Sequence, residues 1–352
     1  MKSVIPLDMA LGIANLPFKI SIQMMLEIAK QAINIHSYGD LQKAYEHDLG
    51  ISLSDDEIRS IVKEVGRTVY QYDEEQCAKV LKQNALGKEN RQDPSTDLSQ
   101  VLYIQIFSTS FKTRGKKNEE TSHENKIGAV FNSTDVLHCK TTTGETFQKI
   151  KQREFINHIG ETEAFNIKLY SVALRHGLEN AQTVVILSDN ICAAKTFSDT
   201  CCKEVNIVHI LDLAHLEEKI NQFANTFVKG KEERELWVKS MMKLLKSAQI
   251  DDALKLAKLH TNLKKPLSQK ILTYIEENRE GMGYQSFLKS DYIIDSNSLD
   301  DGSRPAINNR LNLSGMRWEI EAAKYVSTLK CKYDSGLWES VVEPLIFKKY
   351  VG

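Results

Sequence analysis

Apolar residues follow a helical spacing in the first part of the chain, from residue 20 to residue 70. Ser37 is a residue type that opens helices, and Gly50 is one that closes them. Ser54 and Glu57 have the spacing of a capping box, which begins the next helix. The pattern therefore predicts helices joined by a tight turn, an arrangement that a helix-turn-helix shares.

The pattern changes after a polar stretch at 84–98, which contains Asn, Gly, Asp, Pro and Ser and predicts a linker. Residues 101–107 alternate between apolar and polar side chains and are rich in strand-forming types. Two further segments of this kind follow at 127–131 and 136–143, separated by turn signals. We expect these three segments to form three consecutive antiparallel strands.

The next elements alternate between helix and buried strand. A helical pattern at 161–175 precedes the apolar run 184–187, and a further helix precedes the run 205–211. Three antiparallel strands, a helix, a strand, a helix and a strand make up the element order of a ribonuclease-H-like sheet. From 216 to about 290 the pattern is helical, which predicts an inserted helical lobe.

These elements together predict an α/β fold class. We expect a ribonuclease-H-like mixed sheet with an all-helical insertion, preceded by a helical N-terminal domain. The predicted divisions are a helical, helix-turn-helix-like region at 1–83, a linker at 84–98, and a catalytic-type domain at 99–352 that contains the insertion at about 216–290.

The composition narrows the class of protein. Hydrophobic residues make up 41% of the chain and charged residues 26%, which is typical of a soluble globular protein. Lysine and arginine number 46 against 47 aspartates and glutamates, so the overall charge does not indicate a polyanionic partner. Any surface for nucleic acid must therefore be local.

The cysteines and the apolar segments suggest where the protein works. The six cysteines show no CxxC pair of the kind that holds zinc, and we expect them to be reduced. No segment approaches the ~20 uncharged apolar residues of a membrane span, and the N-terminus lacks a cleavage pattern. The prediction is a cytoplasmic protein without a membrane partner.

A basic stripe lies on the helix that follows Ser54. Arg59, Lys63 and Arg67 repeat at four-residue spacing, so they share one face of that helix. They could lie along the phosphates of DNA, but acidic residues fill the first turn, where a reading helix usually meets the bases. A solvated charged face of a helical bundle is the alternative, and the sequence does not decide between the two.

Aspartates stand at the ends of the two buried strands. Asp189 follows the first of these strands, at the edge where α/β sheets place their sites. A lone aspartate there is more often a turn former or a helix cap than a metal ligand. Asp212 follows the second strand and either caps the next helix or contributes, with His215, to a catalytic pocket.

Several short blocks occur in a fixed order along the chain. They are Tyr-Ile-Gln-Ile-Phe-Ser-Thr at 103–109, Leu-Ser-Asp-Asn at 187–190, Ile-Leu-Asp-Leu-Ala-His at 210–215, Ile-Asp-Ser-Asn-Ser-Leu-Asp-Asp at 294–301, Leu-Ser-Gly-Met-Arg-Trp at 313–318 and Ser-Gly-Leu-Trp at 335–338. These blocks resemble those of bacterial insertion-sequence DDE transposases. That family carries Tyr-Ile-x-x-Asp-Gly-Thr, Leu-Ser-Asp-Gly, Ile-Leu-Asp-x-x-His and Ile-Gly-Ser-Gly-x-x-Glu-Ser before Gly-Met-Arg-Trp.

The resemblance implies a chemistry and a ligand set. Family members hydrolyse a phosphodiester of double-stranded DNA at the element ends and transfer the 3′-hydroxyl to target DNA, using Mg²⁺ or Mn²⁺. The matching catalytic and metal-ligand positions are Asp189 and Asp300. The first aspartate of the family is replaced by Phe107, whose phenyl ring cannot coordinate a hard cation. Asp300 is also one methylene shorter than the family's glutamate.

These departures predict impaired catalysis. Asp295 stands where the family has a glycine, and Pro305 falls where the family continues its last helix, so the geometry around Asp300 should differ as well. We therefore expect an insertion-sequence transposase homologue with weakened metal binding. The alternative is a non-catalytic DNA-binding or regulatory derivative, which could form homo-oligomers or mixed oligomers.

Further basic residues are candidate DNA contacts outside the stripe. Lys112 and Arg114 fall in the first hairpin loop, and Arg310 and Arg317 lie near or on the final helix. For the hairpin residues a solvated turn is the simpler explanation. Trp318 could stack on a base or fill the core, and the core role is favoured.

Overall fold

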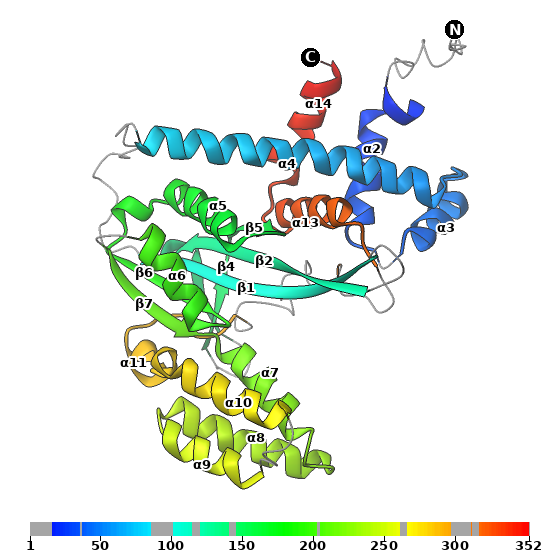
Figure 1. Ribbon diagram of the computed structural model, residues 1–352. Coiled ribbons are helices and arrows are strands. Elements are labelled where there is room, and N and C mark those ends of the chain that lie inside the picture. The colour runs from blue at the N-terminus through cyan, green and yellow to red at the C-terminus, as the bar shows by residue number, and fades with distance from the viewer. Residues whose placement is uncertain are drawn as a thin grey trace.

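The computed structural model describes residues 16–35, 37–85, 101–114, 120–140, 146–202, 205–260, 266–296, 311 and 317–351. A five-stranded mixed sheet forms the centre, with helices on both faces and a helical lobe on the side away from the N-terminal helices (Figure 1). None of the helices in these ranges is both long and apolar enough to cross a membrane.

The N-terminal region is helical, as predicted, and one of its helices begins after Ser37 and ends at Gly50, as the sequence indicates. A short 3-10 turn, η1 (Pro17–Lys19), precedes α2 (Ile22–Ala32), α3 (Tyr38–Leu49) and α4 (Asp55–Ala85). The Ser37 hydroxyl accepts a hydrogen bond from the backbone N–H of Asp40 at 3.1 Å, and Gly50 ends α3 with a left-handed φ of 64°.

The predicted capping box is present at the start of α4. The Glu57 N–H donates to the Ser54 hydroxyl at 3.2 Å, and the Ser54 N–H donates to the Glu57 carboxylate at 2.8 Å. Helix α4 then continues for 31 residues. It is therefore much longer than the second helix of a helix-turn-helix requires.

The central sheet combines antiparallel and parallel pairs. Its strands are β1 (Val101–Arg114), β2 (Glu120–Asn132), β5 (Glu154–His158), β6 (Thr183–Ser188) and β7 (Asn206–Leu211). The spatial order is β5-β2-β1-β6-β7; β2 is antiparallel to β1 and β5, and β6 is parallel to β1 and β7. This mixed α/β arrangement is compatible with the expected ribonuclease-H-like sheet.

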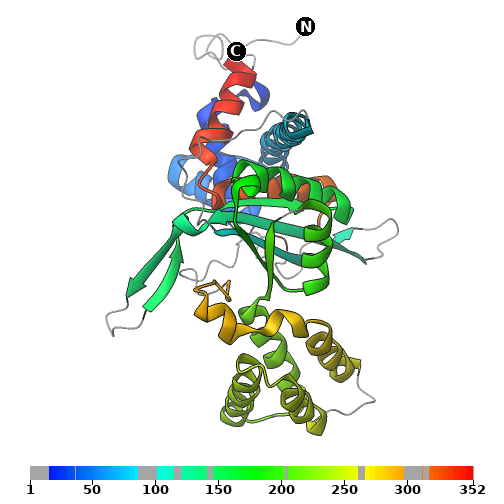
Figure 2. The same cartoon turned by 90° about the vertical axis from the view of Figure 1, so that its left-hand side faces the viewer.

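The segment 136–143 was predicted as the third consecutive antiparallel strand; 136–140 is a strand, but its predicted place beside β2 was wrong, and 141–143 lie outside the described residues. There β3 (Val136–Lys140) pairs with β4 (Thr146–Ile150) in a separate hairpin, which projects from the body (Figure 2). A capped 3-10 turn, η3 (Ser133–Asp135), redirects the chain after β2. The third strand of the sheet is β5 instead, because its side chains alternate between buried and half-buried whereas those of β3 are half-buried or exposed.

Helices cover both faces of the sheet. Helices α5 (Thr162–Arg175) and α6 (Ile191–Cys201), with the turn η4 (Leu178–Asn180), pack on one face. Helix α13 (Ile320–Asp334) packs on the other face beside β5, and a π-helical segment, η6 (Trp338–Val342), leads into α14 (Glu343–Val351).

The segment between β7 and α13 contains the helical lobe. Its elements are α7 (Leu213–Ala224), α8 (Lys231–Lys246), α9 (Ile250–His260), α10 (Pro266–Glu277), η5 (Arg279–Met282) and α11 (Tyr284–Lys289). Gly281 lies so close to β7 that an added Cβ would be 2.8 Å from the backbone nitrogen of Leu211. The lobe therefore contacts the sheet at the end of β7.

The N-terminal helices share a hydrophobic core with the C-terminal ones. Buried residues of α2 and α4 form one cluster with Trp318, Trp338 and Ile346. Gly66 permits the close approach of α4 to α13, since a Cβ there would lie 2.5 Å from the Cβ of Tyr325. The predicted division at 84–98 falls mostly outside the described residues and stays a prediction.

Candidate functional site

The structure brings Phe107 and Asp189 together on neighbouring strands. Strand β6 ends at Ser188, which is the parallel partner of Ile106 in β1. The next residues along the two strands are therefore Phe107 and Asp189. The backbone N–H of Ser108 donates to the Oδ2 atom of Asp189 at 3.3 Å, which fixes the carboxylate against β1.

The ring of Phe107 belongs to a hydrophobic cluster beneath α13. We call this the Cys331 cluster; its buried members are Ile127, Ala129, Phe155 and Cys331. The ring is partly buried and packs against these side chains. Position 107 thus contributes apolar contact and offers no ligating atom beside Asp189.

The carboxyl group of Asp189 is a weaker acid than an ordinary aspartate. Burial is the largest influence and raises its pKa to about 6, and the negative charge of Asp212 acts in the same direction. The hydrogen bond from Ser108 and the positive charge of Lys219 oppose this shift. Asp189 is therefore ionised at neutral pH but takes up a proton in mildly acidic solution.

Asp212 acts as a helix cap, one of the two roles expected for it. Its Oδ1 atom accepts the backbone N–H of Ala214 at 2.9 Å at the start of α7. The same oxygen accepts the N–H of Ser296 at 3.3 Å. Next to it, the N–H of Leu213 donates to the carbonyl of Ile294 at 3.0 Å, so the chain returning from the lobe is attached to the strand end.

Two polar residues of the lobe reach the end of β6, and the sequence did not single them out. The Tyr274 hydroxyl donates to the backbone carbonyl of Asp189 at 3.0 Å, and the Asn278 side chain accepts the N–H of Ile191 at 2.8 Å. The ring of His215 lies edge-on to Tyr274, with centroids 6.3 Å apart. The helical spacing of Tyr274 and Asn278 in the sequence does not indicate these long-range contacts.

The described residues do not by themselves form a two-metal site. Asp189 follows β6 and Asp212 follows β7, and burial with the charge of Asp295 raises the pKa of Asp212. In the described ranges no group of three or more His, Cys, Asp or Glu is arranged to hold a metal ion. Asp300 lies outside the described residues, so its ligand role and the Mg²⁺ or Mn²⁺ cofactor stay predictions.

The basic stripe on α4 is ion-paired along its length. Each of its three cations is partly exposed and has a carboxylate within 3.5 Å. The pairs are Arg59 with Asp56 at 3.2 Å, Lys63 with Glu321 at 3.2 Å and Glu319 at 3.4 Å, and Arg67 with Glu64 at 2.5 Å. These contacts favour the solvated charged face, and DNA contact at this stripe stays a prediction.

Lys112 and Arg317 lie on chain segments that pair with each other. The Trp318 N–H donates to the carbonyl of Lys112 at 3.1 Å, and Trp318 forms a parallel bridge with Thr113. The prediction that Lys112 lies in the hairpin loop was wrong, because β1 continues to Arg114 and Lys112 pairs with Ser122 of β2. Lys112 and Arg317 are both exposed. Trp318 itself is only 8% exposed, and its indole N–H donates to the carbonyl of Leu311 at 3.2 Å, which confirms its core role.

The remaining predicted contacts cannot be placed as side chains. Arg114 is the last residue of β1, but its side chain lies outside the described residues, as do Arg310 and Pro305. The predicted DNA contacts that the structure does bring near one another are thus Lys112 and Arg317. Comparison of the chain with protein-family models, with curated proteins and with solved structures gives no match.

Proposed function

We propose that this chain is an insertion-sequence transposase homologue in which strand cleavage is impaired. The observation that carries the proposal is the position of Phe107 beside Asp189, at the end of β6 in a mixed sheet of order β5-β2-β1-β6-β7. Of the sequence blocks that resemble the family, those at 187–190 and 210–215 span the ends of β6 and β7, and the block at 103–109 includes Phe107. The family's first two carboxylates would occupy these two positions.

Impairment follows from the chemistry of the site. Two cations about 3.5–4 Å apart must be held by carboxylates, so that one activates the attacking oxygen and the other stabilises the leaving oxygen. A phenyl ring at position 107 has no lone pair for this purpose. Asp212 cannot take its place freely, because one of its oxygens already accepts two backbone N–H groups.

A second candidate is a non-catalytic DNA-binding or regulatory derivative of a transposase. The exposed cations Lys112 and Arg317 on paired segments favour it. Such a protein would occlude element ends or form mixed oligomers with an intact relative. It predicts salt-dependent binding to double-stranded DNA without cleavage.

Cleavage of DNA that carries the element's terminal repeats tests the first proposal. The wild type and the Phe107→Asp variant would be compared in Mg²⁺ and in Mn²⁺. Phe107→Asn is the control, because asparagine is similar in size to aspartate but carries no charge. We expect nicking by Phe107→Asp to exceed that of the other two proteins by at least tenfold. Measurable nicking by the wild type at a rate comparable to that of Phe107→Asp would overturn the proposal.

Gel-shift titration across a series of salt concentrations separates the two candidates. Binding without cleavage by both the wild type and Phe107→Asp would support the regulatory derivative. Absence of DNA binding even at low salt would remove it.

A further inference from the structure

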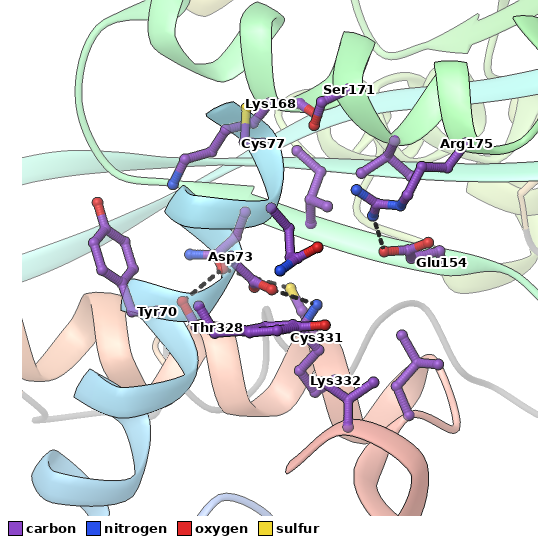
Figure 3. A pocket seen from close by; sticks show the side chains of 17 residues that line it. Tyr70, Asp73, Cys77, Glu154, Lys168, Ser171, Arg175, Thr328, Cys331 and Lys332 are labelled. Carbon is purple, nitrogen blue, oxygen red and sulfur yellow. Dashed lines mark hydrogen bonds and ion pairs between the residues drawn. The ribbon is translucent and has the colours of Figure 1, made fainter. Parts of the chain in front are cut away.

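A cavity of about 220 Å³ lies between α4, α5, β5, α13 and η6, away from the strand-end aspartates (Figure 3). Part of its wall is apolar and includes Ile156, Val172, Leu337 and Val341. Ligand sites for drug-sized molecules usually measure about 300–1,000 Å³, so this cavity suits a smaller molecule.

Three ion pairs lie at or beside the cavity. The pairs are Asp73 with Lys332 at 2.7 Å, Glu154 with Arg175 at 2.5 Å, and Lys168 with Glu74. The Lys332 side chain is 5% exposed and that of Glu154 is 15% exposed. Three cations and two carboxylates line the cavity, and each of these cations is already paired with a carboxylate, so the cavity does not favour a polyanion.

Two carboxylates compete for one buried lysine. Burial raises the pKa of Asp73, and the neighbouring charge of Glu154 adds to this, while Lys332 opposes it. Burial also disfavours the charge on Glu154, but His176, Arg175 and Lys332 outweigh it and lower its pKa to about 2. Because both carboxylates line the cavity, a ligand ammonium group there would be attracted to them.

Arg175 offers a partner for a negatively charged group of a ligand, such as a carboxylate. The guanidinium of Arg175 lines the cavity and has a side-chain exposure of 35%, and its further N–H groups can donate to a ligand carboxylate while it stays paired with Glu154. Lys168, which also lines the cavity, lies over the ring of Tyr70 at 4.6 Å. The cavity therefore offers carboxylates, cations and an apolar wall within one small volume.

We propose that this cavity binds a free α-amino acid with an apolar side chain. The ligand ammonium lies between Asp73 and Glu154, its carboxylate meets Arg175, and its side chain packs on the wall formed by Val172 and Val341. A ligand that carries both charges, at separate positions, matches a lining that contains both carboxylates and cations. The inference concerns a different part of the molecule from the strand-end site and does not depend on the proposed function.

Calorimetric titration of the full chain tests this with L-leucine and L-phenylalanine. N-acetyl-leucine and leucine amide serve as probes that each lack one charge. We expect the free amino acids to bind, and each derivative to bind at least about tenfold more weakly, because a charge-assisted hydrogen bond is lost. Failure of both amino acids to bind at millimolar concentration, or equal binding of the derivatives, would overturn the proposal.

Two variants locate the site. Val341→Phe fills the cavity without removing a charge, and Val351→Phe makes the same change at a position that is 73% exposed. Binding should be lost in the first and kept in the second, with thermal melting as the check on folding. Arg175→Gln, at the rim, should weaken binding of the free amino acid but leave that of leucine amide unchanged. Unaltered binding of leucine by folded Val341→Phe or by Arg175→Gln would refute the assignment.

Discussion

Phe107 and Asp189 are next-neighbour positions on two parallel strands, and the backbone N–H of the residue after Phe107 donates to the Asp189 carboxylate at 3.3 Å. One position thus carries an aromatic ring in an apolar cluster, and the other a carboxyl group of raised pKa. An aspartate introduced at position 107 would therefore lose the apolar contacts of the phenyl ring. Its carboxylate would also lie beside that of Asp189, which carries the same charge.

Phe107→Asp should lower the free energy of unfolding by about 1–3 kcal/mol, because the ring leaves the Cys331 cluster and the new carboxylate repels Asp189. Mn²⁺ should restore part of that loss, since a cation between two carboxylates stabilises both. Denaturant unfolding with and without Mn²⁺ measures this. Phe107→Asn should also lose unfolding free energy, but Mn²⁺ should not restore it. Equal recovery of stability by both variants in Mn²⁺ would argue against a cation shared between positions 107 and 189.

The raised pKa of Asp189 makes the stability of the fold depend on pH. Its folded-state pKa of about 6 exceeds the ordinary value of 3.8, so the folded state binds the proton more tightly. The stabilisation is complete below pH 3.8 and is lost as pH rises through about 6. Asp189→Asn should therefore gain about 1–2 kcal/mol relative to wild type between pH 4 and pH 7, a value reduced for partial solvent screening.

Thermal or urea unfolding of both proteins at the two pH values checks the Asp189 prediction. Asp199→Asn is the matched control, because Asp199 is exposed on α6. It makes the same change of charge away from the end of β6. A pH-independent difference between Asp189→Asn and wild type would contradict the shift.

Glu154 should show the opposite pH dependence. Its pKa is lowered from 4.5 to about 2, so its contribution to stability is present above pH 4.5 and lost as pH falls toward 2. Glu154→Gln should cost about 2–3 kcal/mol at pH 7, because Arg175 and His176 lose their partner. The difference from wild type should shrink as the pH is lowered to 2, and a constant difference in urea unfolding would count against this account.

Local signals in the sequence predicted the local features well. Ser37, Gly50, Ser54 and Glu57 act at helix ends through groups within a few residues, so their roles follow from spacing alone. The third strand was misplaced because a short apolar run does not reveal which partner it pairs with. Only the tertiary fold decides whether 136–140 or 154–158 completes the sheet.

The candidate site was predicted in part, for a similar reason. The alignment of Phe107 with Asp189 follows from motif order, since both lie on strands that the blocks mark. The contact of Tyr274 with Asp189 spans 85 residues, and no spacing rule links a helix of the lobe to a strand end. The shared core of the N-terminal and C-terminal helices was missed because it depends on packing between the two ends of the chain.

Tyr274 should couple the lobe to the sheet. Tyr274→Phe removes a hydroxyl that donates to the Asp189 carbonyl at 3.0 Å and leaves the ring packing in place. We expect a loss of about 1 kcal/mol in the free energy of unfolding. Backbone amides at the start of α6 should also exchange faster with deuterium, whereas those of α2 should not change. Unchanged exchange at α6 would mean that the hydroxyl does not hold this contact.

DNA affinity should depend on Lys112 and Arg317 more than on the α4 stripe. Replacing Lys112 and Arg317 together with Gln should weaken binding and reduce the dependence of log affinity on log salt by about 2, because each phosphate contact contributes roughly 0.9 to that slope. Replacing Arg59 and Arg67 with Gln is the matched control. Those two cations already neutralise Asp56 and Glu64, so their loss should leave the slope nearly unchanged. Gel-shift titrations at several salt concentrations measure both double variants, and a larger effect from the α4 pair would place the DNA surface on that helix instead.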